Sequence, residues 1–206
     1  GRHAIGHHCS ARYALECSMS SRPLLGICIG GRGRRMGGVQ KALLPAPAAP
    51  SGPQRAETLI ARLIRVGREA DCDVVLLGLA ELGPDAHGVP QLPDAALQVG
   101  PLAGLQSLLH LAGARPALCL ACDMPFVTPE LLGRLAREQA DAAVLAPREP
   151  VTGKWEPLFA RYDAARVAPV LSAALAAGER SFQALFRRLS VSELTLTAQE
   201  RTALRD

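Results

Sequence analysis

A short apolar run that breaks into a glycine-rich, arginine-rich loop occupies residues 24–44 and reads LLGICIGGRGRRMGGVQKALL. The leucines and isoleucines at its start predict a buried strand. The loop that follows contains Gly30, Gly31 and Gly33, which can adopt backbone angles closed to other residues. Backbone N–H groups of such a loop, together with its arginines and with Lys41, are suited to hold phosphate groups. The stretch therefore predicts a strand that leads into a phosphate-binding loop.

Spacing excludes two common phosphate-binding loops. The P-loop needs Gly-Lys followed by Ser or Thr, whereas Lys41 lies between Gln40 and Ala42. The dinucleotide-binding fingerprint needs a third glycine where this chain has Met36. The remaining alternative is an arginine-rich surface turn, but composition alone rarely places five glycines and a lysine in this order after a strand.

Length and composition are typical of one globular α/β domain. The chain has 206 residues, of which 49% are hydrophobic and 20% charged. A net charge of +4 suits an anionic small substrate, and the 3% of aromatic residues excludes the basic and aromatic surface of a nucleic-acid binder. No apolar run reaches the ~20 residues of a membrane span, and no signal peptide is visible, so we expect a cytoplasmic protein.

Residues 1–22 mix histidines, cysteines and small polar residues without any period. We expect a disordered extension there, followed by a single domain over residues 23–206. His3, His7, His8 and Cys9 could bind a metal, but a disordered tail is the better interpretation.

Cys119 and Cys122 form a C-x-x-C pair, but two observations argue against a zinc site. They fall in a predicted strand, where residues three apart face opposite ways. A zinc site also needs two more ligands, and none lies at suitable spacing. Buried apolar cysteines are the better interpretation.

The order of predicted elements indicates a mostly parallel sheet with helices on both faces, in three layers. The predicted elements are a helix over residues 56–70, strands over 73–79, 117–122 and 142–146, a further strand over 155–162, a loop over 81–94, helices that begin at Pro101 and after Thr128, and two helices in 163–189, with Pro169 near the first turn of the earlier one or kinking it. Ligands of such sheets bind outside the carboxyl ends of the strands. We therefore expect the glycine loop and Asp123 at one edge.

Asp123 is the best single candidate for a metal ligand, because it follows an apolar strand and precedes Met124 and Pro125. Mg²⁺ prefers oxygen ligands and commonly takes one or two protein carboxylates, completing its shell with phosphates and water. From spacing alone, a second interpretation is equally good, in which Asp123 only caps the following turn.

The loop resembles the signature of the molybdenum cofactor guanylyltransferases and their nucleotidyltransferase relatives, which runs strand, Gly-Gly, a short link, Arg-Met-Gly, two or three residues, Lys and an apolar pair. The matching residues are Gly30, Gly31, Arg35, Met36, Gly37, Lys41, Leu43 and Leu44. Four further stretches are similar to the family: Gly-Pro-Leu-Ala-Gly at 100–104, Asp-x-Pro at 123–125, Trp-Glu-Pro-Leu at 155–158 near the family's pterin side, and Gly-Glu-Arg at 178–180. The resemblance covers roughly residues 24–189 and implies a Rossmann-like nucleotidyltransferase fold.

The resemblance implies an enzyme that transfers GMP from GTP to molybdopterin, with Mg²⁺ and with release of pyrophosphate. By the same resemblance, the catalytic residues are Arg35, Lys41 and Asp123, and Asp123 is the metal ligand. The implied nucleotide-binding residues are Ile29, Gly30, Gly31, Gly33, Lys41, Asp94, Gly100, Pro101, Leu102 and Asp123. GTP and molybdopterin are then the substrates, nucleic acid and membrane are not partners, and transient contact with molybdoenzymes or cofactor-delivery proteins is the protein partnership to test.

Three alternatives stay open: a cytidylyltransferase of the same cofactor, a sugar-phosphate nucleotidyltransferase, and a non-catalytic nucleotide- or pterin-binding relative. Intact Lys41 and Asp123 argue against the last of these, whereas one departure from the family favours it. Relatives usually close with a segment similar to Asn-x-Asn-Thr-Pro-Glu-Asp that finishes the sheet, whereas residues 195–206 read TLTAQERTALRD without any asparagine. We therefore expect that this segment is truncated or lost, which puts full activity in doubt.

Overall fold

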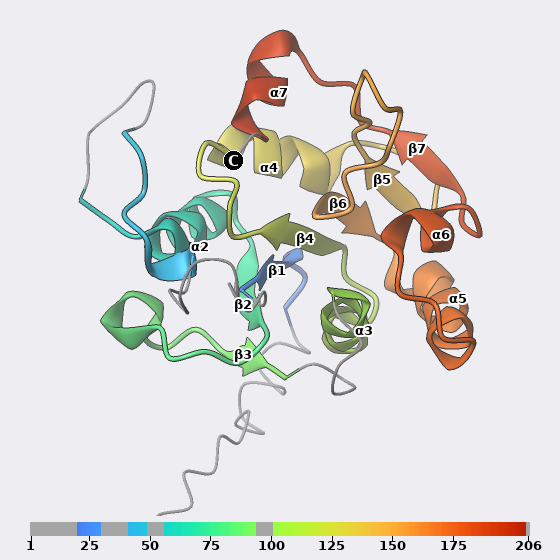
Figure 1. Ribbon diagram of the computed structural model, residues 1–206, viewed down its shortest axis with the longest axis horizontal. Helices are drawn as coiled ribbons and strands as arrows, with labels where there is room; N and C mark the ends of the chain where they lie inside the picture. Colours follow the sequence, from blue (N-terminus) through green and yellow to red (C-terminus); the bar gives the residue numbers. More distant parts are fainter. Residues whose placement is uncertain (1–19, 30–40, 49–55, 94–100, 205–206) are drawn as a thin grey trace, which may run out of the picture.

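The computed structural model describes residues 20–29, 41–48, 56–93 and 101–204. Within these ranges, seven strands form one sheet in the order β3-β2-β1-β4-β6-β5-β7 (Figure 1). The strands are β1 (Leu24–Cys28), β2 (Asp73–Leu77), β3 (Gln91–Leu92), β4 (Ala117–Ala121), β5 (Val144–Ala146), β6 (Phe159–Tyr162) and β7 (Val191–Glu193). Only β6 runs antiparallel to its neighbours among these strands, so the predicted mostly parallel sheet is confirmed.

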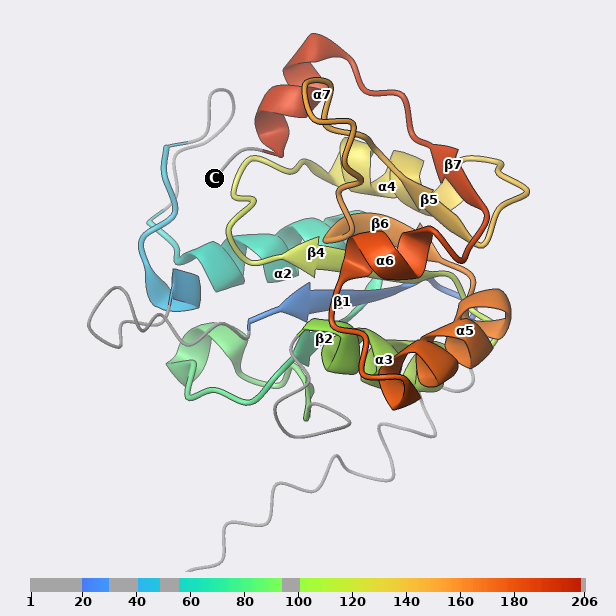
Figure 2. The ribbon, with the colours of Figure 1, turned by 45° about the vertical axis from the view of Figure 1, so that its right-hand side comes forward.

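Helices cover both faces of the sheet, which confirms the predicted three layers (Figure 2). The helices are α2 (Leu59–Glu69), α3 (Pro101–Ala112), α4 (Pro129–Arg137), α5 (Ala164–Ala176), α6 (Phe182–Phe186) and α7 (Ala198–Ala203), with two 3-10 turns, η1 (Lys41–Leu43) and η2 (Gly83–Ala86). Leu25 and Ile27 of β1 are buried in one core with residues of α2 and α4. Leu24, on the other face of the strand, is buried with residues of α3, α5 and α6. None of the helices in the described ranges is long and apolar enough to cross a bilayer.

Two glycines allow the helices to approach the sheet closely. A Cβ on Gly26 of β1 would lie 2.9 Å from a methyl group of Leu108 on α3. A Cβ on Gly67 of α2 would lie 2.6 Å from a methyl group of Leu25. Because interiors are close-packed, each position requires glycine for the helix to sit at its present distance from the sheet.

The helix starts agree with the sequence predictions. Thr128 caps α4 by accepting a hydrogen bond from the Leu131 N–H, and Pro129 is the first helical residue. Pro101 begins α3. The helix over residues 56–70 is confirmed as α2, and two helices follow residue 163 as expected. Pro169 lies inside α5, beyond its first turn, and the helix continues to Ala176.

The structure corrects two of the predicted elements. The predicted loop over residues 81–94 contains β3 and η2, because β2 offers its free edge to two extended residues. The predicted strand over 155–162 is ladder-paired only from Phe159 onward, because Pro157 interrupts it and the Phe159 N–H donates to the Glu156 carbonyl in a turn. Trp155 instead forms an isolated antiparallel bridge with Arg148.

The chain after α6 adds one edge strand to the sheet and then a short helix. β7 pairs in parallel with β5, and Thr197 then begins α7 with a capping box to Glu200. Leu194 and Leu196, between β7 and this cap, are buried, at 1% and 5% exposure. They hold this part of the chain against the core that contains residues of α2 and α4.

Candidate active site

The carboxyl ends of β1, β2 and β4 lie in register at one edge of the sheet. The Ile29 N–H donates to the Leu77 carbonyl over 3.1 Å, and the Cys122 N–H donates to the Cys28 carbonyl over 3.2 Å. The segments that leave β1 and β4 therefore start side by side. We call this edge the carboxyl edge.

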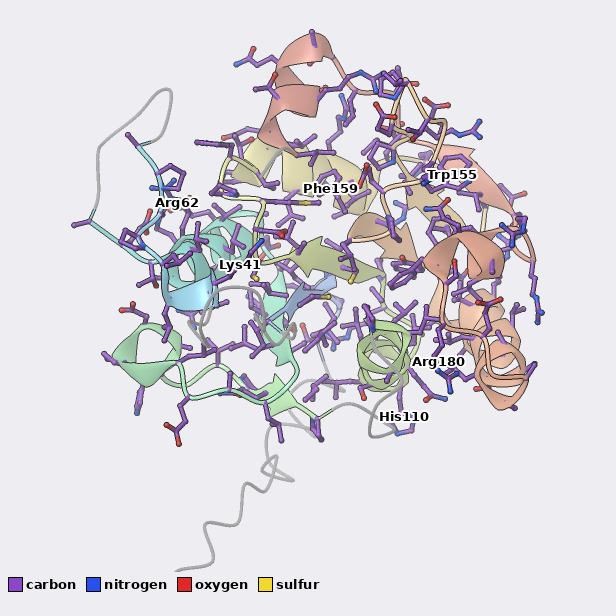
Figure 3. The ribbon with its side chains drawn as sticks, viewed as in Figure 1. Lys41, Arg62, His110, Trp155, Phe159 and Arg180 are labelled. Atoms are coloured by element: carbon purple, nitrogen blue, oxygen red, sulfur yellow. The ribbon has the colours of Figure 1, made fainter. Side chains whose placement is uncertain are left out.

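Lys41 and Asp123 meet at the carboxyl edge. The Lys41 Nζ lies 3.5 Å from the Asp123 Oδ2, and the two side chains are 48% and 38% exposed. Figure 3 places Lys41 beside the end of β4. Because both groups are half open to solvent, a ligand can reach the ammonium and the carboxylate without any rearrangement of the core. The prediction that the glycine loop and Asp123 lie at one edge is confirmed for Lys41, the end of that loop, which lies within the described ranges.

Lys41 lies on a firmly held base. Ala42 beside it is buried in the core, at 2% exposure. The chain after η1 pairs with the start of α2: the Leu59 N–H donates to the Leu44 carbonyl over 2.9 Å. Arg62, 5% exposed, donates to the Glu57 carboxylate over 3.0 Å and to the Pro47 carbonyl over 2.7 Å. These contacts fix the backbone from which the Lys41 side chain extends.

Sequence reasoning missed the charged network that supports this base. Arg65 donates a hydrogen bond to Glu57, which is the main cause that lowers the pKa of Glu57, and Arg62 adds to the effect. The available signal was Arg62 itself, an arginine that interrupts the apolar face of the α2 pattern.

Asp123 is held by the residues that flank it. The Cys122 N–H is fixed on the Cys28 carbonyl, and the Met124 side chain is 7% exposed, inside the core beneath α2 and α4. Burial, and after it the charge of Asp123, raises the pKa of the Cys122 thiol to about 11. The thiol next to Asp123 is therefore neutral at physiological pH.

The cysteines near this edge pack on different faces of the sheet. Cys119 is buried with residues of α3 and α5, whereas Cys122 packs against the core of α2 and α4, so the two face opposite ways as predicted. The Cys28 Sγ lies 3.4 Å from the Cys119 Sγ. Across the described part of the chain, no group of three or more His, Cys, Asp or Glu side chains could hold a metal ion.

The structure describes only some of the other predicted site residues. Ile29 directly follows β1, and Pro101 is exposed at the start of α3. The Leu102 side chain is fully buried in the core, so only its backbone is left for a nucleotide contact. Six predicted residues lie outside the described ranges: Gly30, Gly31, Gly33, Arg35, Asp94 and Gly100.

The Trp-Glu-Pro-Leu segment also reaches the carboxyl edge, because β6 is antiparallel to β4. The Ala121 N–H donates to the Leu158 carbonyl over 2.9 Å, two residues before Asp123. The sequence analysis placed this segment near the family's pterin side by resemblance, but it assigned no role to Glu156 itself. The sequence feature that could have pointed to Glu156 is an acidic residue directly before the proline that opens an apolar strand.

A protein-family model described as a MobA-like NTP transferase domain matches residues 26–193. The chain belongs to this family. The match begins within β1 and ends within β7, so it spans the strands of the sheet and the carboxyl edge with Lys41 and Asp123. Members of the MobA-like family are nucleotidyltransferases, and the identification as an enzyme of this kind agrees with the sequence prediction.

Individual relatives agree with this assignment. The chain is 36% identical over 177 residues to a molybdenum cofactor guanylyltransferase from Pseudomonas putida, covering 85% of this chain and 87% of the relative. It is 38% identical over 168 residues to one from Pseudomonas entomophila, covering 78% and 81%. The crystal structure of molybdopterin-guanine dinucleotide biosynthesis protein A from Archaeoglobus fulgidus superposes with a TM-score of 0.64 and 25% identity, covering 83% of this chain and 82% of that one.

Proposed function

We propose that the chain transfers GMP from GTP to molybdopterin in a Mg²⁺-dependent reaction that releases pyrophosphate. The observation that carries the proposal is the pairing of Lys41 and Asp123 at the carboxyl edge, 3.5 Å apart and open to ligands. It occurs in a chain whose relatives in Pseudomonas are named for guanylyl transfer to the molybdenum cofactor.

Lys41 and Arg35 hold the phosphates of GTP in this proposal. Lys41 supplies a point charge on a fixed base, and Arg35 supplies a planar fork of donors. Gly30, Gly31 and Gly33 add backbone N–H donors. Phosphoryl-type transfer needs little covalent help from a protein, because positioning and neutralisation of charge supply most of the catalysis.

The residues at the carboxyl edge fit a magnesium ion that is shared with the nucleotide. Mg²⁺ commonly takes only one or two protein carboxylates and fills its remaining positions with phosphate oxygens and water. Asp123 offers such a carboxylate, and its side chain is 38% exposed. Within the described ranges it does not belong to a larger cluster of metal-binding side chains. Bound there with GTP, the ion would neutralise charge on the phosphates.

The reaction joins the two substrates by one bond and breaks another. An oxygen of the terminal phosphate of molybdopterin attacks the α-phosphorus of GTP, and the bond from that phosphorus to the bridging oxygen of the β-phosphate breaks. Pyrophosphate carries away the bond's electron pair. A phosphate nucleophile is already ionised at neutral pH, so no general base is needed from the chain.

Calorimetric titration of the purified chain with GTP, CTP, ATP and UTP, each with and without Mg²⁺, tests the nucleotide part of the proposal. We expect GTP to bind most tightly and only with Mg²⁺. Preference for CTP would replace the proposal with cytidylyl transfer. Absence of binding to any nucleotide would overturn the proposal and leave only the non-catalytic alternative in its pterin-binding form.

Asp123→Asn tests the metal ligand. The neutral amide keeps the size of the side chain but loses the charge that holds Mg²⁺, so the variant should lose most of the Mg²⁺-dependent gain in GTP affinity. Asp141→Asn, a fully exposed aspartate at the opposite edge before β5, is the matched control and should bind as the unmodified chain does. An Asp123→Asn variant with unaltered magnesium dependence would exclude Asp123 as the ligand.

A further inference from the structure

Glu156 lies at the carboxyl edge, on the segment that enters β6 next to the end of β4. Two backbone bonds place it: its N–H donates to the Pro147 carbonyl over 3.0 Å, and its carbonyl accepts from the Phe159 N–H over 3.2 Å. Leu158, two residues on, accepts from Ala121, which is itself two residues before Asp123. Glu156, just before β6, and Asp123, just after β4, therefore lie at the same edge of two neighbouring strands.

The residue before Glu156 is firmly anchored. The Trp155 N–H donates to the Gln183 side chain over 3.2 Å, and the Gln183 amide donates back to the Trp155 carbonyl over 2.8 Å. The Arg148 guanidinium lies over the Trp155 ring, 4.6 Å from its centroid, and the Phe186 ring lies 6.3 Å from it. Figure 3 shows Trp155 and Phe159, which bracket Glu156 on the way into β6. The Glu156 backbone is therefore held in place without a ligand.

The Glu156 side chain differs from the other acidic groups on this side of the sheet. It is partly buried, and within the described part of the chain its carboxylate accepts no hydrogen bond and forms no ion pair. Burial, followed by repulsion from Glu149, raises the pKa of Glu156. The Glu156 oxygens are not among the buried polar atoms of the described chain, so donors from outside the protein can reach them. A carboxylate that is partly removed from water and has no donor from the protein gains when a ligand supplies such donors.

We propose that Glu156 accepts the paired N–H donors of a 2-amino-4-oxopyrimidine ring bound at the carboxyl edge. One side of that ring carries an N–H and an adjacent amino group, and these two donors match the two oxygens of one carboxylate. Guanine and pterin both contain this ring, so either substrate of the reaction could supply it. The inference rests on the proposed function, and it makes Glu156 a residue that determines ring specificity.

Matched ring pairs test the inference, because the members of each pair differ in whether the ring carries an amino group or an oxygen at position 2. XTP replaces the amino group of GTP by an oxygen, and lumazine does the same for pterin. We would titrate the full chain with all four compounds in Mg²⁺, and repeat the titrations with Glu156→Gln. The unmodified chain should favour the amino member of one pair by about tenfold or more, as two hydrogen bonds to a charged group allow.

Glu156→Gln presents one acceptor and one donor, which match the 2-oxo ring instead. The variant should lose the preference for the amino ring and move toward the 2-oxo ring, a gain that partial unfolding cannot produce. A change in the GTP–XTP pair assigns Glu156 to the nucleobase, and a change in the pterin–lumazine pair assigns it to the acceptor. Asp141→Asn removes the same charge at the opposite edge and should keep both preferences.

Two results separate failure of this inference from failure of the proposed function. If the unmodified chain binds GTP with Mg²⁺ but favours neither amino ring, or if Glu156→Gln keeps the unmodified preferences, the inference is overturned and guanylyl transfer stands. If the unmodified chain binds no nucleotide, the proposed function fails, and the inference then stands or falls on the pterin–lumazine pair alone.

Discussion

Replacement of Lys41 by alanine separates a ligand-binding lysine from a structural one. Its ion pair with Asp123 spans 3.5 Å between side chains that are 48% and 38% exposed. Ion pairs of such exposure contribute about 0.2–1 kcal/mol to stability, because water screens the attraction and both side chains lose freedom. Lys41→Ala should therefore lower the free energy of unfolding by less than about 1 kcal/mol, which corresponds to a fall in Tm of about 4 °C or less for a chain of this size.

The same substitution should have a much larger effect on the nucleotide. A hydrogen bond between an ammonium and a phosphate contributes about 1.5–3 kcal/mol, so its loss should weaken GTP binding by about 10–100-fold. Thermal unfolding followed by circular dichroism gives the first quantity and calorimetric titration with GTP and Mg²⁺ gives the second. Both are measured on the same preparation.

Lys154→Ala is the matched control, because Lys154 is the other lysine of the chain and is exposed in the segment between β5 and β6. It should change neither GTP affinity nor Tm appreciably. The reasoning is refuted if Lys41→Ala lowers Tm by much more than about 4 °C, which would make the lysine structural, or if GTP affinity is unchanged.

Three further substitutions test the packing and the charges that support the site. Arg161 of β6 donates to the carbonyls of Leu135, Ala136 and Glu138 at the end of α4. Arg161→Met should therefore lower the free energy of unfolding, measured by urea titration, by about 1–3 kcal/mol. An unchanged midpoint of the urea transition would mean that water replaces the guanidinium. Gly67→Ala should destabilise the chain, because the new Cβ meets the buried side chains of Leu25 and Val74. Gly133→Ala should stabilise it by about 0.5–1 kcal/mol, because the new Cβ meets only the flexible end of Arg137. Equal effects at both positions would contradict the packing argument. The hydrogen bond from Arg65 is the main cause that lowers the pKa of Glu57 in the folded chain from 4.5, so the stabilisation by the Glu57 charge is present above pH 4.5 and is lost as pH falls through the folded pKa. Urea titrations between pH 7 and pH 3 should find Glu57→Gln less stable than the unmodified chain at pH 7, with a difference in stability that closes on acidification. A difference in stability that stays constant with pH would exclude the charge as its cause.

Local patterns predicted the parts of the fold that short-range chemistry decides. The Thr128 cap followed by Pro129 needs only neighbouring residues, and so does the apolar face of α2. The meeting of Lys41 with Asp123 was also predictable, because parallel strands that connect through helices bring their carboxyl ends to one edge.

Long-range pairing decided what the sequence could not predict. β3 is two residues long and exists because β2 provides an open edge. β6 is reversed because the segment before it folds back on itself, with the Glu149 N–H donating to the Lys154 carbonyl over 2.8 Å. That reversal also brings Glu156 to the carboxyl edge, whereas the sequence indicated only, by resemblance, that its segment lies near the family's pterin side.

The end of the described chain shows what a local pattern leaves open. β7 pairs with β5, and Thr197 caps α7. Leu194 and Leu196 are buried between these two elements. Their burial depends on where β7 lies in the sheet, which neighbouring residues alone do not decide.

The most direct test of the account is to incubate the purified chain with GTP, Mg²⁺ and molybdopterin, and to quantify pyrophosphate together with the dinucleotide product. The account predicts that both form in equal amounts, that neither forms without molybdopterin, and that Asp123→Asn forms little of either. Equal pyrophosphate release with and without molybdopterin, or dinucleotide formation from CTP but not from GTP, would contradict it.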